Sequence, residues 1–216
     1  MGIESVKMFN QLAEDYDGWF DSHPGVFQSE LEALKKVTPQ SGEGLEVGVG
    51  SGRFAAALGI KTGIDPSVQL SHFAKLRGID VFEGVAESLP FQEQQFDFVL
   101  FNTALCYVDL PLVALLEAKR VLKPNGKIII GMIDKHSMLG QQYEATKQDN
   151  PFSQYAHFYS VSEILELLHE IHFTEEAINQ TLFAPIDTII TAEESKPGYG
   201  EGGFIALSAG MSPFSY

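Results

Sequence analysis

A glycine-rich turn constrains the fold of this chain more than any other feature. Residues 46–52 read Glu-Val-Gly-Val-Gly-Ser-Gly, at the end of a strand-like stretch over 43–49 and directly before the helix-forming residues 53–58. Glycines at alternating positions let backbone N–H groups approach a ligand closely. The N-terminus of the helix behind them favours a negatively charged group. The sequence therefore predicts a strand, a glycine turn and a helix in succession.

Two common glycine patterns do not fit this turn. The dinucleotide fingerprint places its third glycine where this chain has Arg53, and the Gly-Lys-Ser/Thr ending of a P-loop is absent. The pattern that remains is an acidic residue followed by three alternating glycines. It is compatible with a turn that binds a ligand and with a turn that only shapes the backbone.

The middle of the chain alternates short apolar runs with helix-like stretches, which is the pattern of a mostly parallel sheet. Strands are expected over 43–49, 61–65, 79–83, 96–101, 127–133, and near 176–183 and 203–208. Helices are expected over 5–20, 26–37, 53–58, 68–77, from Pro111 onward, and after a capping box of Ser160 and Glu163. The helix from Pro111 has an apolar face of Leu112, Val113, Leu115, Leu116 and Val121.

Asp65 ends the second expected strand. An acidic side chain there can bind both hydroxyls of a ribose. The alternative is that Asp65 caps the next helix, but Ser67 is better placed for that role.

Charge narrows the choice of partners. The 216 residues include 14 basic and 29 acidic side chains, for a net charge of −15. Nucleic-acid backbones and anionic membranes are bound by clustered Lys and Arg, so we expect neither as a partner. The sequence does not indicate an oligomeric state.

A single cysteine, Cys106, and the lack of an apolar N-terminal segment predict a cytoplasmic protein.

No metal site is expected. His169 and His172 stand three residues apart, which does not match the His-Glu-x-x-His pattern of a zinc site.

Several segments together resemble the class I methyltransferases that use S-adenosylmethionine, in particular the type 11 group with its quinone-biosynthesis-like enzymes. The segments are LEVGVGSGRFA (45–55), GIDPS (63–67), GVAESLPF (84–91), FDFVLFNTALCYVDLP (96–111) and RVLKPNGKIII (120–130). A weaker likeness extends over 9–20 and 158–173, and residues 198–202 are similar to a small prokaryotic subgroup of unassigned substrate.

The resemblance implies an α/β, Rossmann-like doubly wound fold. Its sheet would have seven strands with the last one antiparallel, and helices would cover both faces. A single methyltransferase domain would span 1–216, with an N-terminal helical cap over 1–40, a core over 42–208 and a tail over 209–216.

The same resemblance assigns residues to S-adenosylmethionine. Those near its methionine part would be Glu46, Gly48, Gly50 and Gly52; those near its ribose and adenine would be Asp65, Pro66, Ala86 and Glu87. Asn102 would lie near the sulfonium and the substrate, and Tyr16 belongs to a helix that closes over the cofactor. Val85 replaces the family's usual Asp, and Cys106-Tyr107 replaces a common His.

Five residues are candidates for substrate contact: Asn102, Tyr107, His23, Tyr199 and Glu201. The last two lie in a glycine-rich segment that is either a mobile lip of the site or a wide hairpin. Tyr16, Trp19 and Phe20 either face the sulfonium or pack against the sheet.

Three functions follow. The first is methyl transfer from S-adenosylmethionine to a small molecule, which the acidic charge shifts toward a neutral or cationic acceptor. The second is a protein of the same fold that binds the cofactor without transfer. The third, a nicotinamide oxidoreductase, is disfavoured by Arg53.

Overall fold

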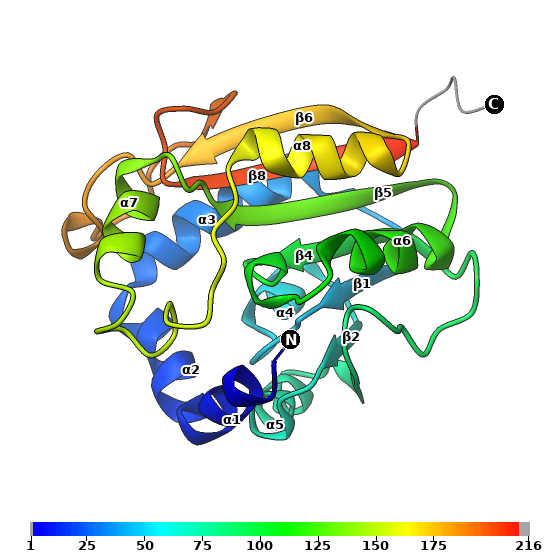
Figure 1. Ribbon diagram of the computed structural model, residues 1–216, viewed down its shortest axis with the longest axis horizontal. Coiled ribbons are helices and arrows are strands. Elements are labelled where there is room, and N and C mark those ends of the chain that lie inside the picture. The colour runs from blue at the N-terminus through cyan, green and yellow to red at the C-terminus, as the bar shows by residue number, and fades with distance from the viewer. Residues whose placement is uncertain (1, 212–216) are drawn as a thin grey trace.

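The computed structural model describes residues 2–211, whose strands form one eight-stranded sheet in the order β3-β2-β1-β4-β5-β8-β6-β7 (Figure 1). The strands are β1 (Gly44–Val47), β2 (Thr62–Asp65), β3 (Asp80–Glu83), β4 (Phe96–Asn102), β5 (Leu122–Ile133), β6 (Phe173–Thr181), β7 (Lys196–Pro197) and β8 (Phe204–Met211). β1 to β5 pair in parallel, and β8 lies antiparallel between β5 and β6. The expected α/β fold with an antiparallel last strand is confirmed.

The expected number of seven strands is wrong. The additional strand, β7, consists of Lys196 and Pro197, which pair with Gln180 and Asn179 of β6. Two residues are too few to show the alternation of apolar and polar side chains that marks a strand in a sequence. β8 also continues to Met211, so residues 209–211 belong to the sheet and not to the expected tail. Positions 212–216 lie outside the described residues.

The helices are α1 (Ile3–Gln11), α2 (Ala13–Ser22), α3 (Pro24–Val37), α4 (Arg53–Leu58), α5 (Val68–Leu76), α6 (Pro111–Val121), α7 (Met138–Ala145) and α8 (Val161–Glu170), with short 3₁₀ turns at Leu105–Tyr107 and Ile186–Thr188. The helix expected over 5–20 is two helices, because the chain turns at Leu12. α7 was not expected; the Ser137 hydroxyl caps it by accepting from the Gly140 N–H.

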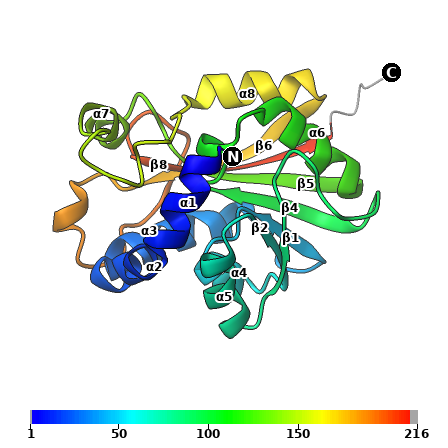
Figure 2. The ribbon, with the colours of Figure 1, turned by 60° about the horizontal axis from the view of Figure 1, so that its bottom comes forward.

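Helices cover both faces of the sheet, as expected. Figure 2 shows α6 and α8 on one face and α3, α4 and α5 on the other. Under α6 and α8, an apolar core includes Leu115 and Leu168. Under α3, α4 and α5, a second core includes Leu34 and Ala55. The carboxyl ends of β1, β2, β4 and β5 remain as the edge where a site can form, as in other open α/β sheets.

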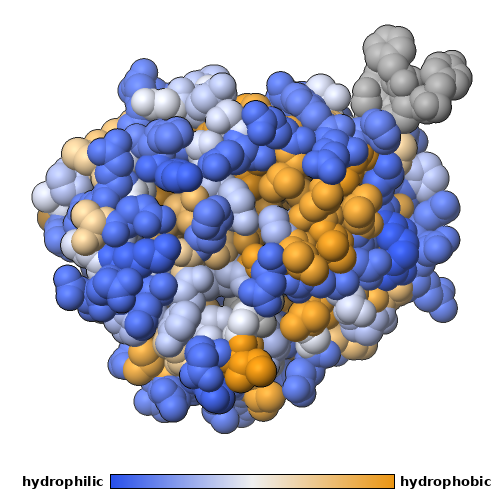
Figure 3. Space-filling model, in the orientation of Figure 1, coloured by the Kyte–Doolittle hydropathy of each residue, from blue (hydrophilic) through white to orange (hydrophobic). Residues whose placement is uncertain are grey.

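The apolar face of α6 is only partly buried. Leu115 and Val121 are fully buried, whereas Val113 and Leu116 are 38% and 47% exposed. Figure 3 shows the apolar side chains that gather over α6 on this side of the molecule. The apolar face that the sequence predicted for α6 is therefore wider than the face that is buried. No helix within residues 2–211 is long and apolar enough to cross a membrane.

Candidate active site

The glycine turn after β1 has the left-handed backbone that its sequence predicts. Gly48, Gly50 and Gly52 have φ angles of 73°, 53° and 77°. A side chain at Gly48 would come within 2.6 Å of the Cβ of Ala104, so packing as well as backbone geometry requires glycine there. A Cβ at Gly50 would lie 3.6 Å from a ring carbon of Tyr16. The turn therefore faces the aromatic ring that the N-terminal helices supply.

Asp65, at the carboxyl end of β2, is bound to this turn. Its Oδ2 accepts from the Gly50 N–H and its Oδ1 accepts from the Ser67 N–H, both at 2.8 Å. Burial raises the pKa of the carboxyl to about 6, although both hydrogen bonds act against the shift. The Ser67 hydroxyl accepts from the Leu70 N–H and caps α5, so Ser67 caps this helix as the sequence predicts. Pro66 lies between them, before the first turn of α5.

Glu46 is buried at the end of β1 with one carboxylate oxygen unsatisfied. Only 2% of its surface is exposed, and Oε2 has no hydrogen-bond partner among the described residues. Burial raises the pKa of this carboxyl well above its usual value. An unsatisfied buried acceptor is costly unless a ligand supplies a donor. The residues around the turn therefore fit S-adenosylmethionine, whose methionine part carries an ammonium group.

Asn102 ends β4 and lies against β5. A Cβ at Gly131 would come within 2.1 Å of the Asn102 Oδ1, and this oxygen too is buried without a partner in the described chain. The next residue, Thr103, has a left-handed φ of 48° and donates its N–H to the Gly131 carbonyl. The unusual backbone at the end of β4 turns the following segment, with Tyr107, toward a cavity.

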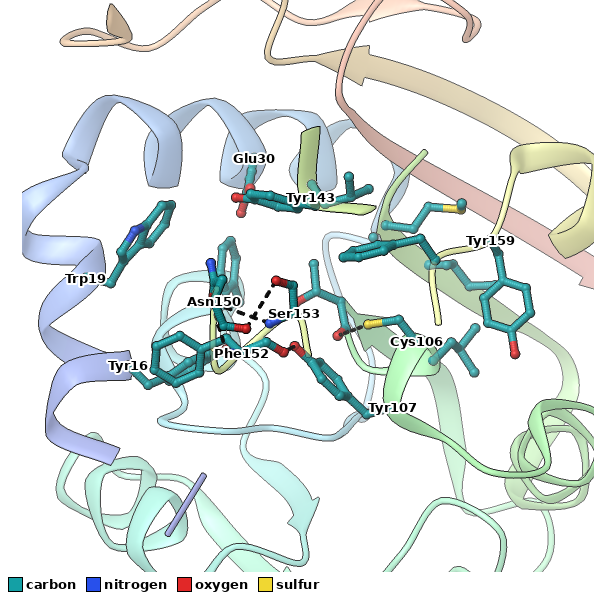
Figure 4. Close-up of a pocket in the computed structure, with 18 of the residues that line it drawn as sticks. Tyr16, Trp19, Glu30, Cys106, Tyr107, Tyr143, Asn150, Phe152, Ser153 and Tyr159 are labelled. Atoms are coloured by element: carbon teal, nitrogen blue, oxygen red, sulfur yellow. Dashed lines mark hydrogen bonds between the residues drawn. The ribbon is translucent and has the colours of Figure 1, made fainter. Parts of the chain in front are cut away.

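That cavity has a volume of about 190 Å³ and lies at the carboxyl ends of β4 and β5, beside α2, α3 and α7 (Figure 4). Its walls are rich in aromatic side chains, which include Tyr16, Trp19, Phe20, Tyr107, Tyr143 and Phe152. Glu46, Asp65, Asn102 and the three loop glycines do not line it. The Tyr16 ring lies beside Gly50 and also lines the cavity, so it joins the two halves of the site.

Tyr107 occupies the cavity wall with its hydroxyl already engaged. The phenol donates to the Phe152 carbonyl over 2.7 Å, and burial raises its pKa well above the usual value. Phe9 of α1 packs edge-on against both Tyr107 and Tyr16, with ring centroids 5.1 and 5.5 Å away. The first two helices thus cover the site, and the Tyr107 hydroxyl is engaged as a hydrogen-bond donor to the Phe152 carbonyl.

Of the five candidate substrate contacts, Tyr107 lines the cavity, whereas Asn102, His23, Tyr199 and Glu201 do not. His23 stacks on Trp19 at 4.2 Å, and its Nδ1 is 2.9 Å from the Trp19 carbonyl. Tyr199 is 52% exposed. Glu201 donates its N–H to Gln180 of β6. The glycine-rich segment that carries Tyr199 and Glu201 is therefore attached to the edge of the sheet, as a hairpin would be.

The two adenine-side candidates lie between β3 and β4. Ala86 is 8% exposed, and Glu87 accepts through Oε1 from the backbone N–H of Asp109 and of Leu110. Glu87 thus holds the start of α6 next to this segment. Their contact with adenine stays a prediction.

Glu30 is a cavity residue that the sequence analysis did not identify. It lies on α3, is 7% exposed, and burial raises its pKa to about 8. One signal was present: Glu30 stands four residues after Val26 and four before Leu34, in the buried stripe of the helix. An acidic residue in an apolar stripe is informative because charged side chains are rarely buried without a partner.

Comparison with known proteins shows the family to which the chain belongs. Residues 45–130 match the family model of a methyltransferase domain. A solved structure from Thermotoga maritima, described as a SAM-dependent methyltransferase and possible histamine N-methyltransferase, is 40% identical with a TM-score of 0.92, covering 95% of this chain and 99% of that one.

Two curated relatives extend the comparison. An uncharacterised protein of Methanocaldococcus jannaschii is 47% identical over 94% of this chain and 98% of its own length. Demethylmenaquinone methyltransferase of Staphylococcus aureus is 34% identical over 57% of each chain. The chain therefore belongs to the class I S-adenosylmethionine-dependent methyltransferases.

Proposed function

We propose that this methyltransferase transfers the methyl group of S-adenosylmethionine to a small molecule bound in the aromatic cavity. The cofactor supplies a methyl group on a positively charged sulfur, and transfer to the acceptor needs alignment more than proton transfer. The residues that would hold it are the glycine turn, Glu46 and Asp65. Tyr16 would border both the cofactor and the acceptor, since its ring lies beside Gly50 and also lines the cavity.

The cavity is the observation that carries this proposal. An apolar cavity of about 150 Å³ holds a benzene molecule, so one of about 190 Å³ suits an acceptor of one ring with a short chain. A protein chain or nucleic acid would need an open groove. The description of the Thermotoga relative places amines among the acceptors to be tried.

Two measurements test the proposal. Calorimetric titration with S-adenosylhomocysteine should show binding at one site, whereas NAD should not bind. Transfer of a labelled methyl group should then occur to at least one member of a panel of small amines, phenols and carboxylic acids. Binding without transfer to any of them would favour the cofactor-binding protein without catalysis, and NAD binding would favour an oxidoreductase.

A further inference from the structure

We propose that Glu30 binds a protonated nitrogen of the acceptor, so that the cavity selects organic amines with a small apolar body. This inference rests on the proposed function, because the cavity is taken as the acceptor site. It adds the chemical class of the acceptor and the residue that recognises it.

The first argument is the isolation of the Glu30 carboxylate. Within residues 2–211 it makes no hydrogen bond or ion pair through its side chain. No Lys, Arg or His is among the described residues that line the cavity, and Glu30 is the only acidic one. The protein itself therefore does not supply the counter-charge.

The second argument is the cost of this arrangement. An ionised carboxylate in apolar surroundings is strongly disfavoured without a partner. Consistent with this cost, burial raises the pKa of Glu30 to about 8, so the free protein keeps the group largely protonated near neutral pH. A ligand that brings an ammonium group provides the missing charge and hydrogen-bond donors at once.

The third argument is the shape and chemistry of the surrounding walls. Figure 4 shows Glu30 at the cavity next to Tyr143, with Trp19, Asn150 and Tyr16 around the same space. Aromatic faces attract cations, and they also accommodate an apolar ring or chain. An aromatic enclosure around one acidic group therefore favours a cationic ligand with an apolar body over an anion or a sugar.

Glu30 has no cationic partner among the described residues that line the cavity, although charged groups lie behind its walls: Lys147 is 6.0 Å from the ring of Phe158, and Asp187 acts on Tyr143. The phenols that interact electrostatically with it are Tyr16 of α2 and Tyr143 of α7, and burial raises the pKa of both. Burial also raises the pKa of the Cys106 thiol to about 12. Recognition of charge in this cavity thus depends on Glu30.

Matched ligands test the inference. Each primary amine is paired with the alcohol of the same skeleton: propylamine with propanol, cyclohexylmethylamine with cyclohexylmethanol, and 2-phenylethylamine with 2-phenylethanol. Binding is measured by calorimetry on protein saturated with S-adenosylhomocysteine. We expect at least one amine to bind about tenfold or more tighter than its alcohol. Equal affinities within every pair would overturn the inference.

Two variants test whether Glu30 causes the preference for amines over alcohols. Glu30→Gln keeps the shape and removes the charge, and it should abolish the preference for the amine. Glu32→Gln makes the same charge change on the exposed side of α3, where Glu32 pairs with Lys35, and it should retain the preference. Glu30→Gln with an undiminished amine preference would overturn the inference. Because S-adenosylhomocysteine binding is measured first on each protein, failure of the proposed function is seen separately.

The number of protons released on amine binding distinguishes direct recognition of the ammonium by Glu30 from a purely structural role of this residue. Calorimetry at pH 7 in two buffers of different ionisation enthalpy counts the protons exchanged on binding. Binding of an amine to the wild type should release close to one proton, because Glu30 ionises when the ammonium arrives. Glu30→Gln should release none. Equal proton release by the two proteins would contradict the assignment.

Discussion

Arg53 and Asp17 join the N-terminal helices to the helix that follows the glycine turn. The Arg53 Nε donates to Asp17 Oδ1 over 2.7 Å, and Nη2 donates to Oδ2 over 3.0 Å. Arg77, just after α5, donates to the same Oδ2 over 2.8 Å. Asp17 directly follows Tyr16, so this pairing holds the Tyr16 ring against the turn. Arg53, which stands where the dinucleotide fingerprint has its third glycine, therefore has a structural role in this fold.

We expect Asp17→Ala to destabilise the protein and weaken cofactor binding. Asp17 and Arg53 are largely buried, with side chains 12% and 15% exposed. Removing Asp17 takes away the acceptor that Arg53 and Arg77 share, although Arg53 still pairs with Asp21 and Arg77 with the Ser51 carbonyl. The free energy of unfolding should fall by about 2–3 kcal/mol in urea titrations. Asp21→Ala is the control, because Asp21 also pairs with Arg53 but is 70% exposed; its effect should stay below about 1 kcal/mol.

The Asp17 interaction also predicts a dependence on pH. Partial burial works against ionisation, but hydrogen bonds from Arg53 and Arg77 lower the pKa of Asp17 to about 2. A carboxyl with a lowered pKa stabilises the fold above its unfolded value, and this stabilisation is lost as pH falls through the folded value. The stability difference between wild type and Asp17→Ala should therefore shrink between about pH 4 and pH 2. A difference that stays constant in this range would contradict the assignment.

Asp65→Ala should abolish binding of S-adenosylhomocysteine. The carboxylate positions the Gly50 N–H and is the expected acceptor for two ribose hydroxyls. Loss of two charge-assisted hydrogen bonds predicts an affinity lower by about 100-fold or more. Asp80→Ala, on the exposed start of β3, should bind normally. Unchanged affinity in a folded Asp65→Ala protein would show that the ribose assignment is wrong.

The features that the sequence predicted are those that local chemistry determines. The glycine turn, Asp65 at the end of β2 and the Ser160–Glu163 capping box each depend on residues close together in the chain. The cavity was not predicted, because it joins α2 and α3 to the ends of β4 and β5, more than 60 residues later. Glu30 lies in an apolar stripe, and only the fold shows that this part of the stripe faces a cavity.

Gly131→Ala should disturb the acceptor end of the site. A methyl group there would lie 2.1 Å from Asn102 Oδ1 and 2.9 Å from the ring of Phe204, which is fully buried. Overpacking of this kind costs about 1–3 kcal/mol, and displacement of Asn102 should lower the rate of methyl transfer. Gly18→Ala is the matched control: no atom lies within 4 Å of its added methyl group, and alanine in the middle of α2 should stabilise the protein by up to about 1 kcal/mol. Equal effects of the two substitutions on stability would contradict the packing argument.

The raised pKa of Glu30 predicts a second effect of pH on stability, opposite in direction to that of Asp17. Because the folded protein holds this proton up to about pH 8 and the unfolded chain releases it near the ordinary glutamate pKa of 4.5, stability is lost as pH rises between these values. Glu30→Gln removes that loss, so the stability of the variant relative to the wild type should increase by several kcal/mol, on the order of 3–5, between pH 5 and pH 9. Asp65 and Glu46 also have raised pKa values, and comparing wild type with Glu30→Gln cancels their contributions. Denaturant titrations of both proteins from pH 5 to pH 9 measure the difference, and parallel curves over this range would show that the Glu30 carboxyl titrates normally.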